Sequence, residues 1–190
     1  MPGIRDQYRI INDAAGWRRK SERGRLIFSG AERITFLQAL LTNDLSGLAV
    51  GGGCYAAYLT PQGRMIADLH VFVRPGEVVA DVPVAAAAEL ASALDRLVFS
   101  EDVAVADASD RLVQFSVAGG TAPECLETAF ELDAPALRNL QPWSQLDLGE
   151  GFVARTDDVS VTSYDLIVPA AEAARVPAVL AAAGGSPLTD

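Results

Sequence analysis

The sequence predicts an α+β fold made of two small lobes. One observation is that a strand and a helix are followed by three strands and a second helix within residues 25–100. Another is that a roughly similar order of strands and helices recurs over residues 101–190, although no sequence repeat accompanies it. A third is the mixture of alternating and helical apolar spacing, which is typical of α+β domains with antiparallel or mixed sheets. We therefore expect an N-terminal segment over 1–24, followed by these two lobes.

The first lobe is predicted to open with a strand over residues 25–29 and a helix after Gly30. The apolar residues of this helix recur at helical spacing: Ile34, Leu37, Leu40 and Leu41. The helix is expected to end near residues 42–44, where Thr, Asn and Asp follow one another.

A β-hairpin and a third strand are expected next. Residues 55–60 and 64–73 have the β-branched and aromatic content of strands, and Pro61-Gln62-Gly63 separates them as a turn. Residues 77–82 give the third strand. An alanine-rich helix over 85–98 then closes the first lobe.

The second lobe is predicted from shorter and weaker signals of the same two kinds. Its expected elements are strands at 103–106, 112–118, 152–155 and 159–168, and helices at 123–130 and 170–183.

The inventory of reactive side chains excludes several classes of enzyme. Cys54 and Cys125 lie 71 positions apart, and His70 is the only histidine, so no zinc ligand set is expected. A serine hydrolase is disfavoured because no G-x-S-x-G elbow occurs. The glycines at 51–53 precede a strand, whereas a phosphate loop needs glycines that open a helix. We expect no metal site and no nucleotide site.

Charge is distributed unevenly along the chain, whose formal net charge is −10. Residues 1–33 hold eight basic and four acidic side chains, so the remainder is strongly acidic. Such a body repels phosphate backbones, and we expect no DNA binding. The basic run at 18–25 is predicted to be a solvated turn before the first strand, the alternative being a contact with an anion, a lipid surface or RNA.

The N-terminus lacks the features of a targeting segment. Residues 1–11 mix charged and polar side chains and contain no continuous apolar core. The small-apolar run at 82–88 contains a proline and is too short to span a bilayer. We expect a soluble, cytoplasmic protein that does not enter the membrane.

The strand over residues 65–73 carries the most informative polar pattern. Alternation places three apolar side chains on one face, Leu69, Val71 and Val73. The opposite face carries Asp68, His70 and Phe72. A carboxylate inside such a strand is unusual, because burying an ion is costly unless it is paired or hydrogen-bonded.

Two interpretations of this strand remain open on the residues alone. One is an open sheet face with polar side chains toward water and an interaction between Asp68 and His70. The other is the floor of a ligand site, where Asp68 accepts a hydrogen bond from a heterocyclic nitrogen. In that case Phe72 or Tyr55 packs on the ring.

Three stretches resemble one known superfamily, that of the glycine-cleavage T-protein and YgfZ. They are residues 25–30 (RLIFSG), 31–45 (AERITFLQALLTNDL) and 55–72 (YAAYLTPQGRMIADLHVF). In that superfamily a strand ending in glycine precedes a Phe-Leu helix, then Thr-Asn-Asp, then a hairpin with an aspartate in its second strand. The Thr-Asn-Asp at 42–44 and the LTPQGR at 59–64 look closer to YgfZ.

The resemblance implies a folate-binding-domain architecture and a set of site residues. Asp68 matches the aspartate that touches the reactive nitrogen region of tetrahydrofolate and is the candidate catalytic residue. Tyr55 and Phe72 match aromatics of the folate pocket, and Asp165 loosely matches an acid that binds the pterin. T-proteins usually carry a second aspartate where Ala67 stands. The Gly-Tyr-Thr-Gly-Glu segment before the pterin-binding acid is also missing.

The function implied by the resemblance is YgfZ-like binding of reduced folate, linked to iron–sulfur cluster assembly or repair or to tRNA modification. One alternative is one-carbon transfer by an aminomethyltransferase of the T-protein type, and catalysis is left open. Another is a non-catalytic interaction domain that has lost the ligand. We expect the chain to hold only the amino-terminal portion of the family architecture, without its carboxy-terminal barrel. The expected partners are a separate carboxy-terminal half or a second copy of the chain, and iron–sulfur proteins.

Overall fold

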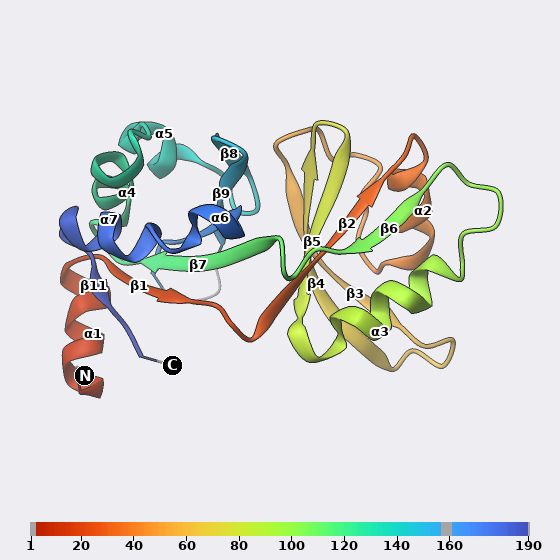
Figure 1. The fold of residues 1–190 in the computed structure, drawn as a ribbon, viewed down its shortest axis with the longest axis horizontal. Helices are drawn as coiled ribbons and strands as arrows, with labels where there is room; N and C mark the ends of the chain where they lie inside the picture. The colour runs from red at the N-terminus through yellow and green to blue at the C-terminus, as the bar shows by residue number, and fades with distance from the viewer. Residues whose placement is uncertain (1–2, 157–160, 190) are drawn as a thin grey trace. The chain divides into compact units, whose positions relative to one another are not determined.

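The computed structural model describes residues 3–156 and 161–189 (Figure 1). The chain divides into two compact units. Residues 21–110 form the central unit, and residues 1–20 together with 111–190 form the terminal unit. Each unit has its own sheet, and the predicted α+β class with one antiparallel and one mixed sheet is confirmed.

The boundaries of the units differ from those of the predicted lobes. Residues 1–20 do not form a segment of their own, because β1 (Gly16–Arg19) pairs with β7 (Leu112–Ala118) in the sheet of the terminal unit. The chain leaves and re-enters this unit near residues 20 and 111. Such a return pairs residues about one hundred positions apart, which local sequence patterns do not reveal.

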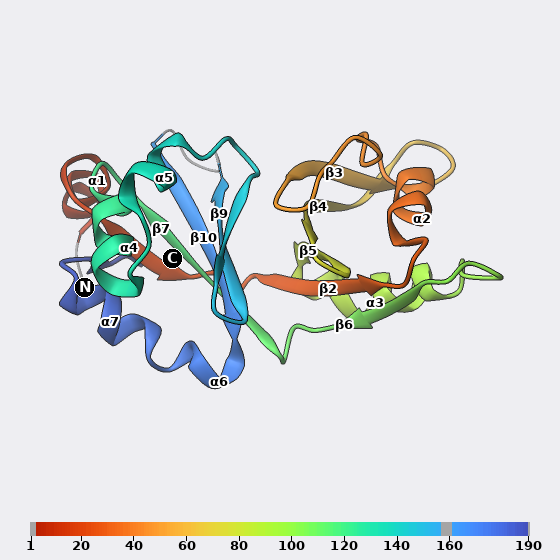
Figure 2. The same ribbon diagram turned by 90° about the horizontal axis from the view of Figure 1, so that it is seen from above.

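The central unit contains an antiparallel sheet of five strands in the order β3-β4-β5-β2-β6 (Figures 1 and 2). Its strands are β2 (Arg23–Ser29), β3 (Gly53–Leu59), β4 (Met65–Arg74), β5 (Glu77–Pro83) and β6 (Ala104–Asp107). Its helices are α2 (Arg33–Leu40) and α3 (Val84–Asp95). The predicted order of strand, helix, three strands and helix is therefore confirmed.

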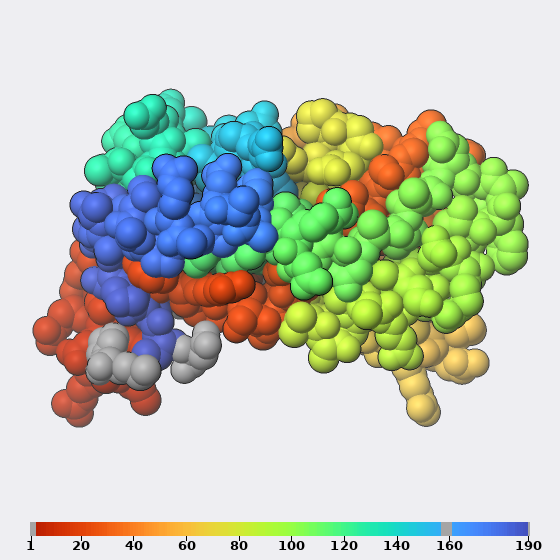
Figure 3. Space-filling model, viewed as in Figure 1, coloured from red at the N-terminus to blue at the C-terminus, as the bar shows by residue number. Residues whose placement is uncertain are grey.

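One face of this sheet carries the apolar core of the central unit. Leu69 and Val71 of β4 alternate with Asp68, His70 and Phe72 and are fully buried in it. Both helices add apolar side chains to the same core: Phe36, Leu37, Ala87, Leu90 and Leu94. The segment between α3 and β6 lies at the surface (Figure 3, light green), and its Phe99 is 85% exposed.

Gly30 makes the tight connection from β2 to α2. Its φ is +102°, a conformation that residues with a side chain rarely adopt. A Cβ atom there would also lie 2.0 Å from the carbonyl oxygen of Asp102. Both constraints explain why the strand ends in glycine at this point.

The terminal unit contains a mixed sheet of six strands in the order β11-β1-β7-β10-β9-β8. Besides β1 and β7, its strands are β8 (Gln145–Leu148), β9 (Gly151–Thr156), β10 (Ser163–Pro169) and β11 (Ser186–Pro187). Its helices are α1 (Ile4–Asp13), α4 (Ala122–Phe130), α5 (Ala134–Asn139), α6 (Ala170–Ala173) and α7 (Val176–Ala182). The single parallel pair joins β1 to β11.

A second apolar core fills the terminal unit. Tyr164 is its largest fully buried side chain, and its hydroxyl donates to the carbonyl oxygen of Leu137 at 3.0 Å. This bond satisfies the one polar atom of the tyrosine side chain inside the core. Burial raises the pKa of Tyr164, although the charges of Arg155 and Arg138 oppose the shift.

Several predictions for the terminal unit need adjustment. The helix expected over 170–183 is two short helices, α6 and α7. Residues 159 and 160 of the expected strand 159–168 lie outside the described residues, and β10 begins at Ser163. None of the helices in the described ranges reaches the length and apolar character that spanning a bilayer requires.

Candidate functional site

The β3–β4 hairpin of the central unit carries three of the predicted site residues, Tyr55, Asp68 and Phe72. In its register Ala57 lies opposite Asp68, and Tyr55 lies opposite His70. Directly opposed residues of an antiparallel pair project to the same face. Tyr55, Asp68 and His70 therefore share the face opposite the apolar core.

The segment after α2 holds the outer edge of β3. The main-chain N–H of Thr42 donates to the carbonyl oxygen of Ala57 at 3.1 Å, and the Thr42 hydroxyl accepts from the Ala57 N–H at 2.9 Å. The side-chain amide of Asn43 donates to the carbonyl oxygen of Tyr55 at 2.8 Å. Two residues of the Thr-Asn-Asp sequence thus fix the strand that carries Tyr55.

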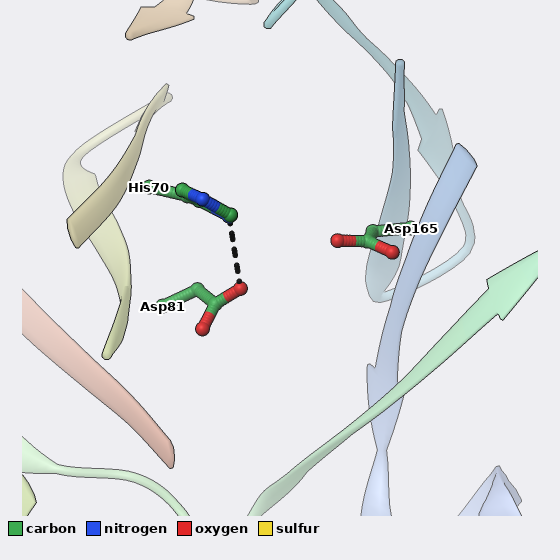
Figure 4. Close-up of side chains that lie close together, drawn as sticks. All are labelled: His70, Asp81 and Asp165. Atoms are coloured by element: carbon green, nitrogen blue, oxygen red, sulfur yellow. Dashed lines mark ion pairs between the residues drawn. The ribbon is translucent and has the colours of Figure 1, made fainter. Parts of the chain in front are cut away.

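A row of polar side chains crosses the sheet from β3 to β2. Tyr55 lies opposite His70, His70 opposite Asp81, and Asp81 opposite Arg25. The rings of Tyr55 and His70 are tilted by 55°, with centroids 5.5 Å apart. His70 Nδ1 lies 3.3 Å from Asp81 Oδ2, and Figure 4 shows the two side chains pointing toward each other.

Arg23 joins this row to Asp68. Its Nε donates to Asp81 Oδ1 at 2.5 Å, and its Nη2 donates to the main-chain oxygen of Asp81 at 3.1 Å. Its Nη1 donates to Asp68 Oδ2 at 3.0 Å. Burial by itself would lower the pKa of Arg23, but the charges of Asp81 and Asp68 and the hydrogen bonds to them raise it above its ordinary value. The guanidinium therefore stays charged wherever the protein is folded.

The two aspartates bound by Arg23 differ in their access to water. The side chain of Asp81 is fully buried, whereas that of Asp68 is 24% exposed. Tyr55 is 46% exposed. Asp68 and Tyr55 are therefore the members of this group that a ligand from solution can reach, and Asp81 supports them from within.

The burial of Phe72 and His70 does not fit an open, polar sheet face, which was one interpretation of this strand. Both lie on the Asp68 face of β4, as the alternation predicts, but Phe72 has no exposed surface and His70 is 7% exposed. The partner of Asp68 is Arg23 rather than the expected His70. Phe72 is thus a buried neighbour of Asp68 on the same face of β4.

Asp165 belongs to the terminal unit, on β10. It has no exposed surface, and its Oδ2 accepts from Lys20 Nζ at 2.9 Å and from Gln114 Nε2 at 2.8 Å (Figure 4 shows its position on β10). The solvated turn predicted over residues 18–25 is confirmed only at Ser21 and Glu22: the ends of this run belong to β1 and β2, and Lys20 is 6% exposed. The basic run supplies internal partners for buried carboxylates.

Neither cysteine has the character of a nucleophile. Cys54 and Cys125 are free and buried. Burial, followed by the charge of Asp44, raises the pKa of Cys54 to about 11, and burial also raises the pKa of Cys125. Both side chains are therefore thiols at neutral pH, when a thiolate is the reactive form.

Sequence reasoning missed Asp81 and Arg23. Asp81 lies between valines and alanines in β5, which is the same signal that singled out Asp68: a carboxylate within an apolar strand. Applied to both strands, that signal would have found Asp81 as well as Asp68. Arg23 was assigned to a turn, and its role depends on the register between β2 and β5.

Comparison with known proteins identifies the family. The GCVT N-terminal domain family matches residues 1–187. The chain belongs to this family. An aminomethyltransferase of Exiguobacterium sibiricum is 28% identical over 177 residues, which cover 91% of this chain and 48% of that protein. An aminomethyltransferase of Bacillus subtilis is 26% identical over 165 residues, which cover 86% of this chain and 46% of that protein.

Two solved structures share the fold of this chain. The glycine cleavage system aminomethyltransferase T from Bartonella henselae matches with a TM-score of 0.83 at 16% identity, over 94% of this chain and 48% of that one. A chain of the heterotetrameric sarcosine oxidase from Corynebacterium sp. U-96 matches with a TM-score of 0.63 at 17% identity, over 90% of this chain and 83% of that one. At these identities the likeness concerns the fold alone.

The chain spans about half the length of the curated relatives named above. The predicted resemblance to the T-protein is confirmed, as is its restriction to the amino-terminal portion. The relatives are named aminomethyltransferases, and nothing in these comparisons favours the YgfZ branch over the T-protein branch.

Proposed function

We propose that this chain is a tetrahydrofolate-binding module of the aminomethyltransferase type, in which Asp68 meets the ligand. The observation that carries the proposal is the half-buried carboxylate of Asp68 on β4, held by Arg23 and accessible from solution. The family membership supports the choice of ligand.

The chemistry of the reachable groups suits a reduced pterin. A tetrahydropterin ring presents several N–H donors and a flat, partly apolar surface. The Asp68 carboxylate supplies an acceptor, and the exposed ring of Tyr55 supplies a surface against which a flat ligand packs. For one-carbon transfer, Asp68 is the candidate catalytic residue, since a carboxylate beside a reacting nitrogen can accept its proton.

Phe72 and Asp165 are also proposed ligand contacts, but unlike Asp68 and Tyr55 they have no exposed surface. Phe72 has no exposed surface, so it supports the face of β4 that carries Asp68 and meets a ligand only if its neighbours move. Asp165 already accepts hydrogen bonds from Lys20 and Gln114. The residue is fully buried with these partners, so its contact with the pterin stays a prediction.

A YgfZ-like role in iron–sulfur cluster assembly or tRNA modification is the second candidate. It rests on the amino-acid sequence of residues 42–44 and 59–64, and on Ala67, which replaces the second aspartate usual in T-proteins. Folate binding through Asp68 is common to both candidates.

We predict that Asp68→Ala abolishes tetrahydrofolate binding and leaves the fold intact. Arg23 keeps its bonds to Asp81 in this variant, and a partly exposed ion pair contributes about 0–1 kcal/mol to stability. Calorimetric titration with tetrahydrofolate, and thermal unfolding of both proteins, measure the two effects.

Asp95→Ala is the matched control, because it removes an exposed carboxylate at the end of α3 in the same unit. The proposed site is supported if the unaltered chain and Asp95→Ala bind alike and Asp68→Ala does not. Equal affinity of all three proteins would remove Asp68 from the site. No binding by the unaltered chain would favour an interaction domain that has lost the ligand.

A further inference from the structure

Arg23 is held rigidly by a single buried residue. Its Nε and Nη2 donate to the carboxylate and to the main-chain oxygen of Asp81, at 2.5 and 3.1 Å. Two bonds from one planar group to one residue fix the orientation of that plane. Because Asp81 has no exposed surface and also faces His70 on β4, it is a fixed anchor within the sheet.

The remaining nitrogen of Arg23 is thereby aimed at Asp68. Nη1 donates to Asp68 Oδ2 at 3.0 Å, while the Arg23 side chain itself is 13% exposed. The three bonds form a chain from Asp81 through Arg23 to Asp68. A lysine could neutralise either aspartate but has no rigid fork with which to bridge both.

This arrangement leaves one oxygen of Asp68 for a ligand. Oδ2 is used by Arg23, and within residues 3–156 and 161–189 no other group bonds to the Asp68 carboxylate. An ionised carboxylate only accepts hydrogen bonds. A group that meets Oδ1 must therefore donate an N–H or O–H, whereas a carbonyl, carboxylate or phosphate oxygen would be repelled.

We propose that Arg23 is a positioning residue of the site: it orients Asp68 so that Oδ1 accepts a hydrogen bond from an N–H of the ligand. The inference rests on the proposed function, because it concerns how Asp68 meets tetrahydrofolate. Arg23 acts through Asp68 and contributes no direct contact of its own to the ligand.

The test is the affinity of Arg23→Lys for tetrahydrofolate, measured by calorimetry. The variant keeps a positive charge beside the buried Asp81, which Arg23→Gln would leave unpaired and prone to unfolding. We expect binding to weaken roughly tenfold, because a charge-assisted hydrogen bond no longer orients the carboxylate. Arg96→Lys, an exposed position on the same unit, is the matched control and should bind as the unaltered chain does.

A double variant separates positioning from a general structural effect. In an Asp68→Asn background, Arg23→Lys should change the affinity by less than about twofold, since the residue through which it acts is already altered. An equal loss in both backgrounds would overturn the inference, because Arg23 would then act independently of Asp68.

The remaining outcomes distinguish the inference from the proposed function. Normal affinity of Arg23→Lys, together with loss of binding in Asp68→Ala, would overturn the inference and leave the proposed function standing. Absence of tetrahydrofolate binding by the unaltered chain would overturn both.

Discussion

Lys20 and Asp165 form a buried ion pair in the terminal unit, with side chains 6% and 0% exposed. Removing both charges from water is costly, and their attraction offsets that cost only while the pair is intact. Gln114 adds a hydrogen bond to the same carboxylate but no charge. Losing one member of the pair therefore destabilises the protein by more than the intact pair stabilises it.

We predict that Lys20→Met destabilises the protein by about 3–5 kcal/mol, because it removes the positive charge that Lys20 places beside the buried Asp165 carboxylate. Urea unfolding measures the change, and Arg19→Met, an exposed neighbour on β1, is the control. The double variant Lys20→Met with Asp165→Leu should recover most of the loss. If Lys20→Met unfolds like Arg19→Met, the buried pair is not a stabilising feature of this unit.

Individual residues also show which features of the site could be predicted from the sequence and which could not. Asp68 could be singled out because a carboxylate within an apolar strand demands a partner. Its partner could not be named, because Arg23 lies 45 positions earlier and comes near only through β5. The burial of Phe72 could not be predicted either. Strand alternation assigns a side chain to one face of the sheet but does not show what covers that face.

At the scale of elements, the segment that follows α2 protects the edge of the central sheet. An edge strand presents unpaired N–H and C=O groups, and proteins commonly cover them. Here Thr42 and Asn43 bond to β3, while Gln38 of α2 accepts from the N–H groups of Leu45 and Ser46. The motif that first suggested a family thus has a structural role in holding Tyr55.

We predict that Asn43→Ala loosens β3 around Tyr55 by about 1 kcal/mol, the usual net value of one hydrogen bond. Hydrogen–deuterium exchange of the β3 amides measures this directly. Asn12→Ala is the control, since it removes a comparable side-chain bond to the main chain of α1. Unchanged exchange in β3 would show that Asn43 does not hold the strand.

The elements that could be predicted are those with strong local signals. The β3–β4 hairpin was expected because a Pro-Gln-Gly turn separates two alternating stretches. The short strands β1, β8 and β11 were missed, since two to four residues carry no usable period and their pairing partners lie elsewhere in the chain. Helix α1 was missed because it has no buried residues among those described.

At the scale of the whole molecule, the chain is built so that its ends belong to one unit and its middle to another. The central unit carries Tyr55, Asp68 and the residues that support them. The terminal unit carries Asp165 with its buried partners. Folate recognition is therefore expected to begin on the β3–β4 hairpin, where the reachable side chains are.

The most direct test of this account is a titration of the labelled 190-residue chain with tetrahydrofolate, followed by the amide resonances of the protein. The account predicts that resonances of β3 and β4 around Tyr55 and Asp68 shift in a saturable way, and that Asp68→Ala removes those shifts. Binding that leaves both strands unchanged, or an absence of any saturable shift, would contradict the assignment of this face as the folate site.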